Sequence, residues 1–391
     1  MTGGDIGMKL KLIPKILLIL FIFSLNFFYL SLNARSSFAS AINSKASVVS
    51  NVLAHSNLTV RSSIHSHVKN NKSKKGYVKI FKGVSSPMAI AVGGNGDIFI
   101  AGDKGRGEIA EFDAVGGRIK TFRRGIYKPW DIAINKAGDI IIANDGIYKN
   151  RKGVKVKGFI TELNPLGKII FKTSEGVNYP YAVAISKNGK IAVANYGNGF
   201  DGYISIYSGN GRLLHKFGRG IQNPYSIVFS KSDLIYAANF NEGTIVCLSP
   251  SGKVLWSAQK KISYPYAVAL GVNGNLWVLN DGNGGSLSKY SPEGKLLKHI
   301  NGPVSYPYGE AIDEKGDIFI ANFNSNSVSE FSSRGKFLGY ASKINRPIGI
   351  IIDKKGNIWA ADGNGDLTKI ENVATGGEYF QFDKKGFPYG R

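Results

Sequence analysis

The chain of 391 residues contains a single cysteine, Cys247. One thiol cannot form a disulfide within the chain, which excludes the small secreted domains that disulfides hold together. Cys247 stands in the apolar segment TIVCLSP, which predicts a buried strand. We therefore expect it to pack as a small hydrophobe rather than to act as a nucleophile. Because 43% of the residues are hydrophobic, a large core is available as the source of stability.

Motifs of several common enzymes are absent as well. The sequence holds no GxSxG nucleophile elbow, no phosphate-binding P-loop and no convincing pair of nucleophile and base. Histidine occurs only five times. These absences argue against acyl-transfer and nucleotide-hydrolysing chemistry, and they favour a protein that binds rather than catalyses.

Acidic residues are few, since 27 Asp and Glu stand against 50 Lys and Arg and the formal charge is +23. This excess favours negatively charged partners, namely nucleic acid, an anionic envelope polymer or a membrane surface, although it can also serve solubility alone. The insertion Tyr148–Gly158 (YKNRKGVKVKG) predicts either a basic rim patch or a solvated loop. Nucleic acid is disfavoured, because basic segments interleaved with aromatic residues are absent and the N-terminus predicts export.

The first residues have the pattern of an export signal. A start with three lysines precedes the apolar run Ile16–Leu32, and Ala39-Ser40-Ala41 offers a small-x-small cleavage site. We interpret residues 1–41 as a signal peptide cleaved after Ala41, with an uncleaved membrane anchor as the alternative. Residues 42–76 are rich in Ser, Asn and Lys and predict a flexible basic linker. The remainder is expected outside the cytoplasm: periplasmic, at the cell surface or secreted.

From residue 77 onward the chain is repetitive. Seven prolines recur at intervals of 40–51 residues, a period typical of a four-stranded propeller blade. After each proline comes an apolar strand, then in most units a glycine turn, and then three further strands. The strand directly after the proline does not alternate in polarity, so we expect it to be buried on both faces. The anchor prolines are Pro87, Pro129, Pro180, Pro224, Pro265, Pro307 and Pro347.

This pattern predicts an all-β fold over residues 77–391, a seven-bladed β-propeller of four-stranded antiparallel blades. A single blade cannot bury both of its faces, so the blades must stack around a ring and close it. Two segments compete for the closing strand, Tyr77–Lys82 (YVKIFK) and Glu378–Phe382 (EYFQF). We favour the N-terminal segment.

The proline, the apolar strand, the glycine turn and the following I-[FWY]-[IV]-A-[ND] pattern resemble NHL repeats and the streptogramin-lyase-like propellers over about residues 77–370. The resemblance implies which residues a metal-dependent lyase of this kind would need. Virginiamycin B lyase uses histidine and glutamate with a divalent metal, and the peptidylglycine amidating lyase uses channel histidines on zinc. Here three histidines lie in the linker, while His215 and His299 lie in predicted outer strands. We therefore expect neither a metal site nor a cofactor.

Two acids are the candidates for catalysis. Glu310 occupies a position that is Ile or Val in the other six units. Burying an ionised carboxylate costs roughly several kcal/mol unless it is ion-paired or hydrated. Glu310 is therefore expected to reach channel water or a basic partner. A structural ion pair is one interpretation. The other is that Glu310 or Asp131 serves as the acid of a lyase or hydrolase in the channel mouth.

Aromatic and amide residues recur at equivalent positions, which blade rotation places around one end of the channel. Such a ring can stack on sugars or hold a peptide, or it can serve packing between blades with the amides capping strand ends. The aromatic residues that follow the proline are Trp130, Tyr181, Tyr225, Tyr266 and Tyr308. The amides that end the second strand are Asn144, Asn195, Asn239, Asn280 and Asn322.

The repeat and the missing catalytic constellation favour an exported, non-catalytic binding or scaffolding propeller. Its expected partner is a protein, peptide or glycan at the channel mouth, with an anionic envelope polymer as a further candidate. The membrane is expected to matter only through an uncleaved N-terminal segment. The alternatives are a channel-mouth lyase or hydrolase and an envelope component without a small ligand.

Overall fold

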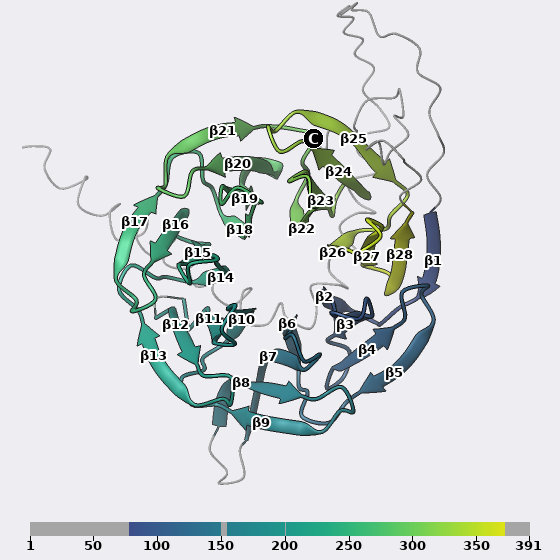
Figure 1. The fold of residues 1–391 in the computed structure, drawn as a ribbon, viewed down its shortest axis with the longest axis vertical. Coiled ribbons are helices and arrows are strands. Elements are labelled where there is room, and N and C mark those ends of the chain that lie inside the picture. Colours follow the sequence, from purple (N-terminus) through teal and green to yellow (C-terminus); the bar gives the residue numbers. More distant parts are fainter. Residues whose placement is uncertain (1–77, 150–154, 200, 372–391) are drawn as a thin grey trace, which may run out of the picture. The chain divides into compact units, whose positions relative to one another are not determined.

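The computed structural model describes residues 78–149, 155–199 and 201–371, which form a seven-bladed β-propeller (Figure 1). Each blade is a four-stranded antiparallel sheet, and in blades 1–6 the strands follow chain order from the innermost to the outermost. The predicted fold class is therefore confirmed.

The first four blades hold the following strands. Blade 1 contains β2 (Pro87–Val92), β3 (Ile98–Gly102), β4 (Glu108–Phe112) and β5 (Arg118–Phe122). Blade 2 contains β6 (Pro129–Ile134), β7 (Ile140–Lys149), β8 (Lys155–Leu163) and β9 (Ile169–Thr173). Blade 3 contains β10 (Pro180–Ile185), β11 (Ile191–Asn195), β12 (Tyr203–Tyr207) and β13 (Leu213–Phe217). Blade 4 contains β14 (Pro224–Phe229), β15 (Ile235–Asn239), β16 (Thr244–Leu248) and β17 (Val254–Ala258).

The remaining three blades complete the ring. Blade 5 contains β18 (Pro265–Leu270), β19 (Leu276–Asn280), the short 3-10 helix η2 (Gly282–Gly284), β20 (Ser286–Tyr290) and β21 (Leu296–Ile300). Blade 6 contains β22 (Pro307–Ile312), β23 (Ile318–Asn322), β24 (Ser327–Phe331) and β25 (Phe337–Ser342). Blade 7 contains β26 (Pro347–Ile352), β27 (Ile358–Asp362), β28 (Asp366–Ile370) and β1 (Val78–Lys82).

The ring closes through the N-terminal strand. β1 lies antiparallel to β28, with Val78 opposite Ile370 and Lys82 opposite Asp366, and so becomes the outer strand of blade 7. This confirms the expected closing strand. The competing segment, residues 378–382, lies outside the described residues, as do the predicted export signal and linker.

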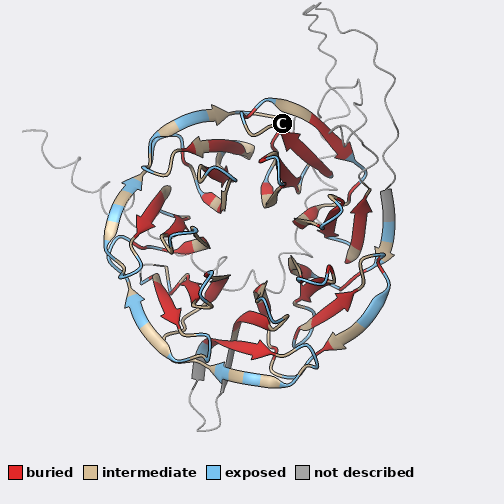
Figure 2. Ribbon diagram, in the orientation of Figure 1, coloured by how far each residue is buried: buried red, intermediate tan, exposed pale blue. Residues whose placement is uncertain are grey.

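The inner strands begin at the repeated prolines and are less buried than expected. Proline has no amide hydrogen to donate, and it is tolerated at the first position of a strand. In every blade the pairing slips between the proline and the residue two places on, a bulge that bends the start of the strand. The second strand, rather than the first, is buried at every position in six blades, and in blade 2 it is buried from Ile140 to Asp145 (Figure 2). The reason is that the inner strand has no further strand between it and the axis.

The hydrophobic core is divided among the seven interfaces between blades. Each of seven buried clusters joins residues of two neighbouring blades, and one of them joins blade 7 to blade 1 around Trp359 and Phe112. Burying one large apolar side chain contributes roughly 1.5–3 kcal/mol. Cys247 is buried in the cluster between blades 4 and 5, as its apolar context predicts.

The described residues contain no helix long and apolar enough to cross a membrane.

Candidate functional site

One end of the propeller is built from a turn that all seven blades share. The residue before each anchor proline has a φ between 47° and 54°, a left-handed conformation that residues other than glycine adopt rarely. Its carbonyl accepts a hydrogen bond, 2.9–3.1 Å long, from the amide of the residue that follows the second strand, or in blade 2 from the amide of Asp145 within the longer strand β7. The seven turn residues are Ser86, Lys128, Tyr179, Asn223, Tyr264, Tyr306 and Arg346.

The repeated asparagines hold this turn. In blade 3, Asn195 Oδ1 accepts a hydrogen bond from the amide of Asn178 at 2.9 Å, while its Nδ2 donates to the Val193 carbonyl and to Ser205 Oγ. The same bond to Oδ1, at 2.8–3.4 Å, forms at the other four asparagines. All five side chains are at most 1% exposed. Their polar groups thus form hydrogen bonds within the protein at the strand ends. This is the capping role, the alternative to ligand binding. The other four are Asn144, Asn239, Asn280 and Asn322.

The five predicted aromatic residues come together in one unbroken series, which we call the aromatic arc: Trp130, Tyr181, Tyr225, Tyr266 and Tyr308. Successive ring centroids lie 4.3, 4.8, 5.3 and 4.7 Å apart. Tyr181 is only 5% exposed, whereas the other four are half-buried. The rings therefore pack against one another and still keep part of their surface accessible.

A second row of aromatic rings lies against the arc. Tyr196 stands 4.7 Å from Tyr181, and Phe240 and Phe323 make equivalent contacts of 4.4 and 4.9 Å with Tyr225 and Tyr308. These three residues directly follow the second strands of blades 3, 4 and 6. Two further tyrosines of the shared turn, Tyr264 and Tyr306, are 51% and 42% exposed. They were not predicted as site residues, although in three units the sequence carries a tyrosine on both sides of the anchor proline.

Asp131 and Glu310, the two candidate acids, lie on the inner strands β6 and β22 and are both half-buried. Burial raises the pKa of Asp131 to about 6, although the amides of Val183 and Ile132 both donate to its carboxylate. Burial, and then the negative charge of Asp131, raise the pKa of Glu310 to about 7. The two carboxyl groups therefore approach the same central region from blades 2 and 6. Among the described residues, Glu310 forms no ion pair with a basic side chain.

A third acid, Asp281, stands at the edge of the aromatic arc and was missed by the sequence analysis as a site residue. It follows β19, at the position where other blades carry Tyr196, Phe240 or Phe323. Its Oδ1 is buried and finds no hydrogen-bond partner within the described structure. Burial raises the pKa of Asp281, and its charge in turn contributes to the raised pKa of Tyr266 and Tyr308. The sequence gives no clear signal for it, because the equivalent position holds Asp103 and Asp145 in blades 1 and 2 and Gly363 in blade 7.

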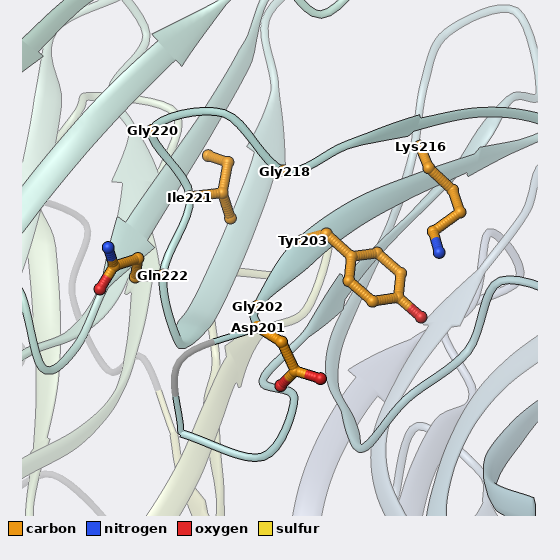
Figure 3. A pocket seen from close by; sticks show the side chains of 8 residues that line it. All are labelled: Asp201, Gly202, Tyr203, Lys216, Gly218, Gly220, Ile221 and Gln222. Carbon is orange, nitrogen blue, oxygen red and sulfur yellow. The ribbon is translucent and has the colours of Figure 1, made fainter.

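A hollow of about 390 Å³ lies elsewhere, on the outer half of blade 3 where β12 begins and β13 ends (Figure 3). Lys216 Nζ stands 4.0 Å from the ring centroid of Tyr203 on its wall. The carboxylate of Asp201 accepts hydrogen bonds from Asn178 and Asn198. Since both charged side chains of the hollow already contact protein neighbours, we place the candidate site at the aromatic arc.

The predicted positions of the histidines in outer strands are confirmed for the two that the structure describes. His215 lies in β13, and His299 lies in β21 with its Nδ1 3.0 Å from Ser288 Oγ. Over residues 78–371, apart from the short gaps, no group of three or more His, Cys, Asp or Glu side chains is placed to hold a metal ion.

Comparison with known proteins finds likeness in structure alone. No protein-family model matches the chain, and no curated protein matches its sequence. A streptogramin B lyase structure aligns with a TM-score of 0.65 and 16% identity over 76% of this chain and 97% of that one. Virginiamycin B lyase from Staphylococcus aureus gives 0.64 and 14% over 76% and 100%, and Kuenenia stuttgartiensis hydrazine synthase gives 0.63 and 14% over 79% and 99%. At such identities the likeness establishes the fold: this chain has a propeller similar to that of streptogramin B lyase.

Proposed function

We propose that this chain is an exported, non-catalytic binding module that holds its ligand on the aromatic arc. The observation that carries the proposal is the unbroken contact of five aromatic side chains from five successive blades, four of which keep part of their surface accessible. Packing between blades needs aromatic area, but it does not need that area to remain accessible at one end of the axis.

The arrangement favours binding for a physical reason. The rings are already immobilised by their neighbours, so a ligand that stacks on them orders few additional side chains. Tyrosine and tryptophan also combine a large apolar face with a polar group that can hydrogen-bond a ligand. A peptide or glycan with an apolar face matches such a surface. The excess of basic residues suits an anionic envelope polymer as a second contact. The N-terminal pattern supports export, and the repeat of proline, apolar strand and glycine turn supports an NHL-like assignment.

Glycan and peptide arrays test this proposal. The full chain is compared with a Tyr266→Ala, Tyr308→Ala double variant and with Tyr203→Ala, which removes a tyrosine from the outer hollow. We expect array binding that the double variant loses and the control keeps, with thermal unfolding confirming that both variants are folded. Equal binding by all three proteins would move the site away from the arc.

A lyase or hydrolase is the second candidate, because the pKa of Glu310 is raised to about 7 and that of Asp131 to about 6. A carboxyl group with a pKa near the working pH suits general acid–base catalysis. Incubation with virginiamycin B, with and without divalent metal, tests this candidate. Turnover that Glu310→Gln abolishes would establish it, whereas the binding proposal expects no turnover.

A further inference from the structure

We infer that the ligand of the aromatic arc carries a positively charged organic amine, either a protonated amine or a quaternary ammonium group. This inference rests on the proposed binding function and names the chemistry that the same site selects.

The charge of the site is the first argument. Three carboxyl groups lie beside the arc: Asp131 and Glu310 on the inner strands β6 and β22, and Asp281 directly after β19. No ion pair within the described residues joins any of them to Lys or Arg. Basic side chains are nevertheless abundant, 50 against 27 acidic ones. Unpaired acids gathered at one end of so basic a chain favour a cationic ligand, because its charge offsets the desolvation of the carboxylates.

The aromatic faces are the second argument. A cation within about 6 Å of a ring centroid is attracted by the negative face of the ring. The same end of the propeller already holds two such contacts: Arg346 Cζ lies 5.6 Å from the centroid of Phe323, and Lys157 Nζ lies 5.7 Å from that of Tyr179. Phe323 in turn contacts Tyr308 of the arc. The arc thus extends an aromatic surface that binds cations within the protein.

The order of these groups along the axis is the third argument. Asp281 lies at the level of the shared turn, the aromatic arc occupies the position after each proline, and Asp131 and Glu310 follow one and two residues further along the inner strands. The charges of Asp281 and Asp131 both act on Tyr266. A ligand cation at the arc therefore has tyrosine rings beside it and carboxyl groups on two sides.

The spread of the acids selects an organic cation over a metal ion. Magnesium and calcium require about six or more oxygen atoms at roughly 2.0–2.6 Å. The described acids do not converge in this manner. An ammonium group that bears alkyl substituents has a diffuse charge and an apolar surface, which matches separated carboxyl groups and a wall of tyrosines.

Isothermal titration of the full chain with choline and with its neutral isostere 3,3-dimethyl-1-butanol tests the inference. We expect choline to bind at least about tenfold more tightly, a ratio within the range of cation–π and charge attraction. Asp281→Asn should reduce that ratio several-fold. Asp233→Asn is the matched control, because it makes the same charge change in the hairpin turn after β14, at the end of that strand away from the aromatic arc. Asparagine also tolerates the positive φ of this position.

Each outcome decides the matter. A choline preference that falls in Asp281→Asn and stays in Asp233→Asn supports the inference. Equal affinity for choline and its neutral isostere, or binding of neither, overturns the inference of a cationic ligand. In that case, a neutral ligand that the arrays show bound at the arc still supports the binding function. If the arrays also show no ligand that depends on Tyr266 and Tyr308, the binding function itself fails.

Discussion

One carboxylate oxygen of Asp131 accepts a hydrogen bond from the backbone amide of Val183, 2.9 Å away on the inner strand of the next blade. The other oxygen accepts from the amide of Ile132 at 2.8 Å. A similar link joins blades 4 and 5, where the amide of Val268 donates to Ser226 Oγ at 3.2 Å. Asp131 therefore ties two blades together while its charge remains close enough to raise the pKa of Glu310.

Replacing Asp131 by asparagine should lower the pKa of Glu310. The substitution removes the negative charge that disfavours ionisation of Glu310, while burial of Glu310 persists. Titration of the Glu310 carboxyl carbon by NMR, in the wild type and in Asp131→Asn, measures the change. Asp233→Asn serves as the control and should leave the pKa of Glu310 unchanged. An unshifted pKa in Asp131→Asn would show that the two acids do not interact.

Glu310→Ile should stabilise the protein at pH 8. Ile or Val stands at this position in the other six blades, and the substitution removes a carboxylate whose ionised form is disfavoured by burial. We expect a gain of about 1–3 kcal/mol in the free energy of unfolding at pH 8, measured with urea. The gain should shrink toward pH 4, where the wild-type carboxyl group is protonated. A loss of stability at pH 8 would instead reveal a stabilising partner for Glu310.

Glu162→Gln should change how stability depends on pH. Glu162 is 3% exposed, and burial, followed by the charge of Asp139, raises its pKa from 4.5 to about 7. Because this folded-state pKa exceeds the unfolded one, its stabilising contribution is complete below about pH 4.5 and is lost as the pH rises through 7.

Urea unfolding of the wild type and Glu162→Gln at pH 5 and pH 8 measures this effect. We expect the variant to be more stable than the wild type by about 1–3 kcal/mol at pH 8, and less so at pH 5. The glutamine retains the oxygen that accepts the hydrogen bond of Asn135. A difference that is the same at both pH values would contradict the raised pKa.

Asn195→Ala should destabilise the protein through the shared turn. The substitution leaves the amide of Asn178 without its acceptor and removes the bonds to Val193 and Ser205. An unsatisfied buried polar group costs about 1–3 kcal/mol, which urea unfolding can resolve. Asn188→Ala, in an exposed hairpin turn, is the control and should change stability by less. If Asn195→Ala lost ligand binding with unchanged stability, the asparagine would have a binding role instead.

Much of the fold follows from the repeat alone. The anchor prolines and the glycine turns mark blade boundaries in the printed sequence, and no long-range information is needed to count them. The closing strand was also predictable, because Tyr77–Lys82 has the pattern of a fourth strand without a unit before it. The burial of the inner strand was wrongly predicted. The reason is that the sequence of an apolar strand does not show whether another strand covers it or whether it faces the propeller axis.

The candidate site was predictable only in part. Equivalent positions in repeated blades must form a ring, so Tyr181 and Tyr266 were expected at one end from their register. Asp281 was not expected, because its importance comes from its place beside Tyr266 of its own blade and Tyr308 of the next, and from burial of its Oδ1. The coupling of Asp131 with Glu310 is likewise absent from the sequence, where 178 intervening residues separate them.

The architecture of this protein can be deduced from its amino-acid pattern: seven units, four strands in each, and the residue types at every repeated position. Local strand patterns and turn residues specify these features because they act within one unit. The roles of those residues depend on how the blades pack together. Whether a tyrosine packs or remains accessible, whether an asparagine is satisfied, and which acids share an environment all depend on the neighbouring blade. That neighbour is supplied by closure of the ring.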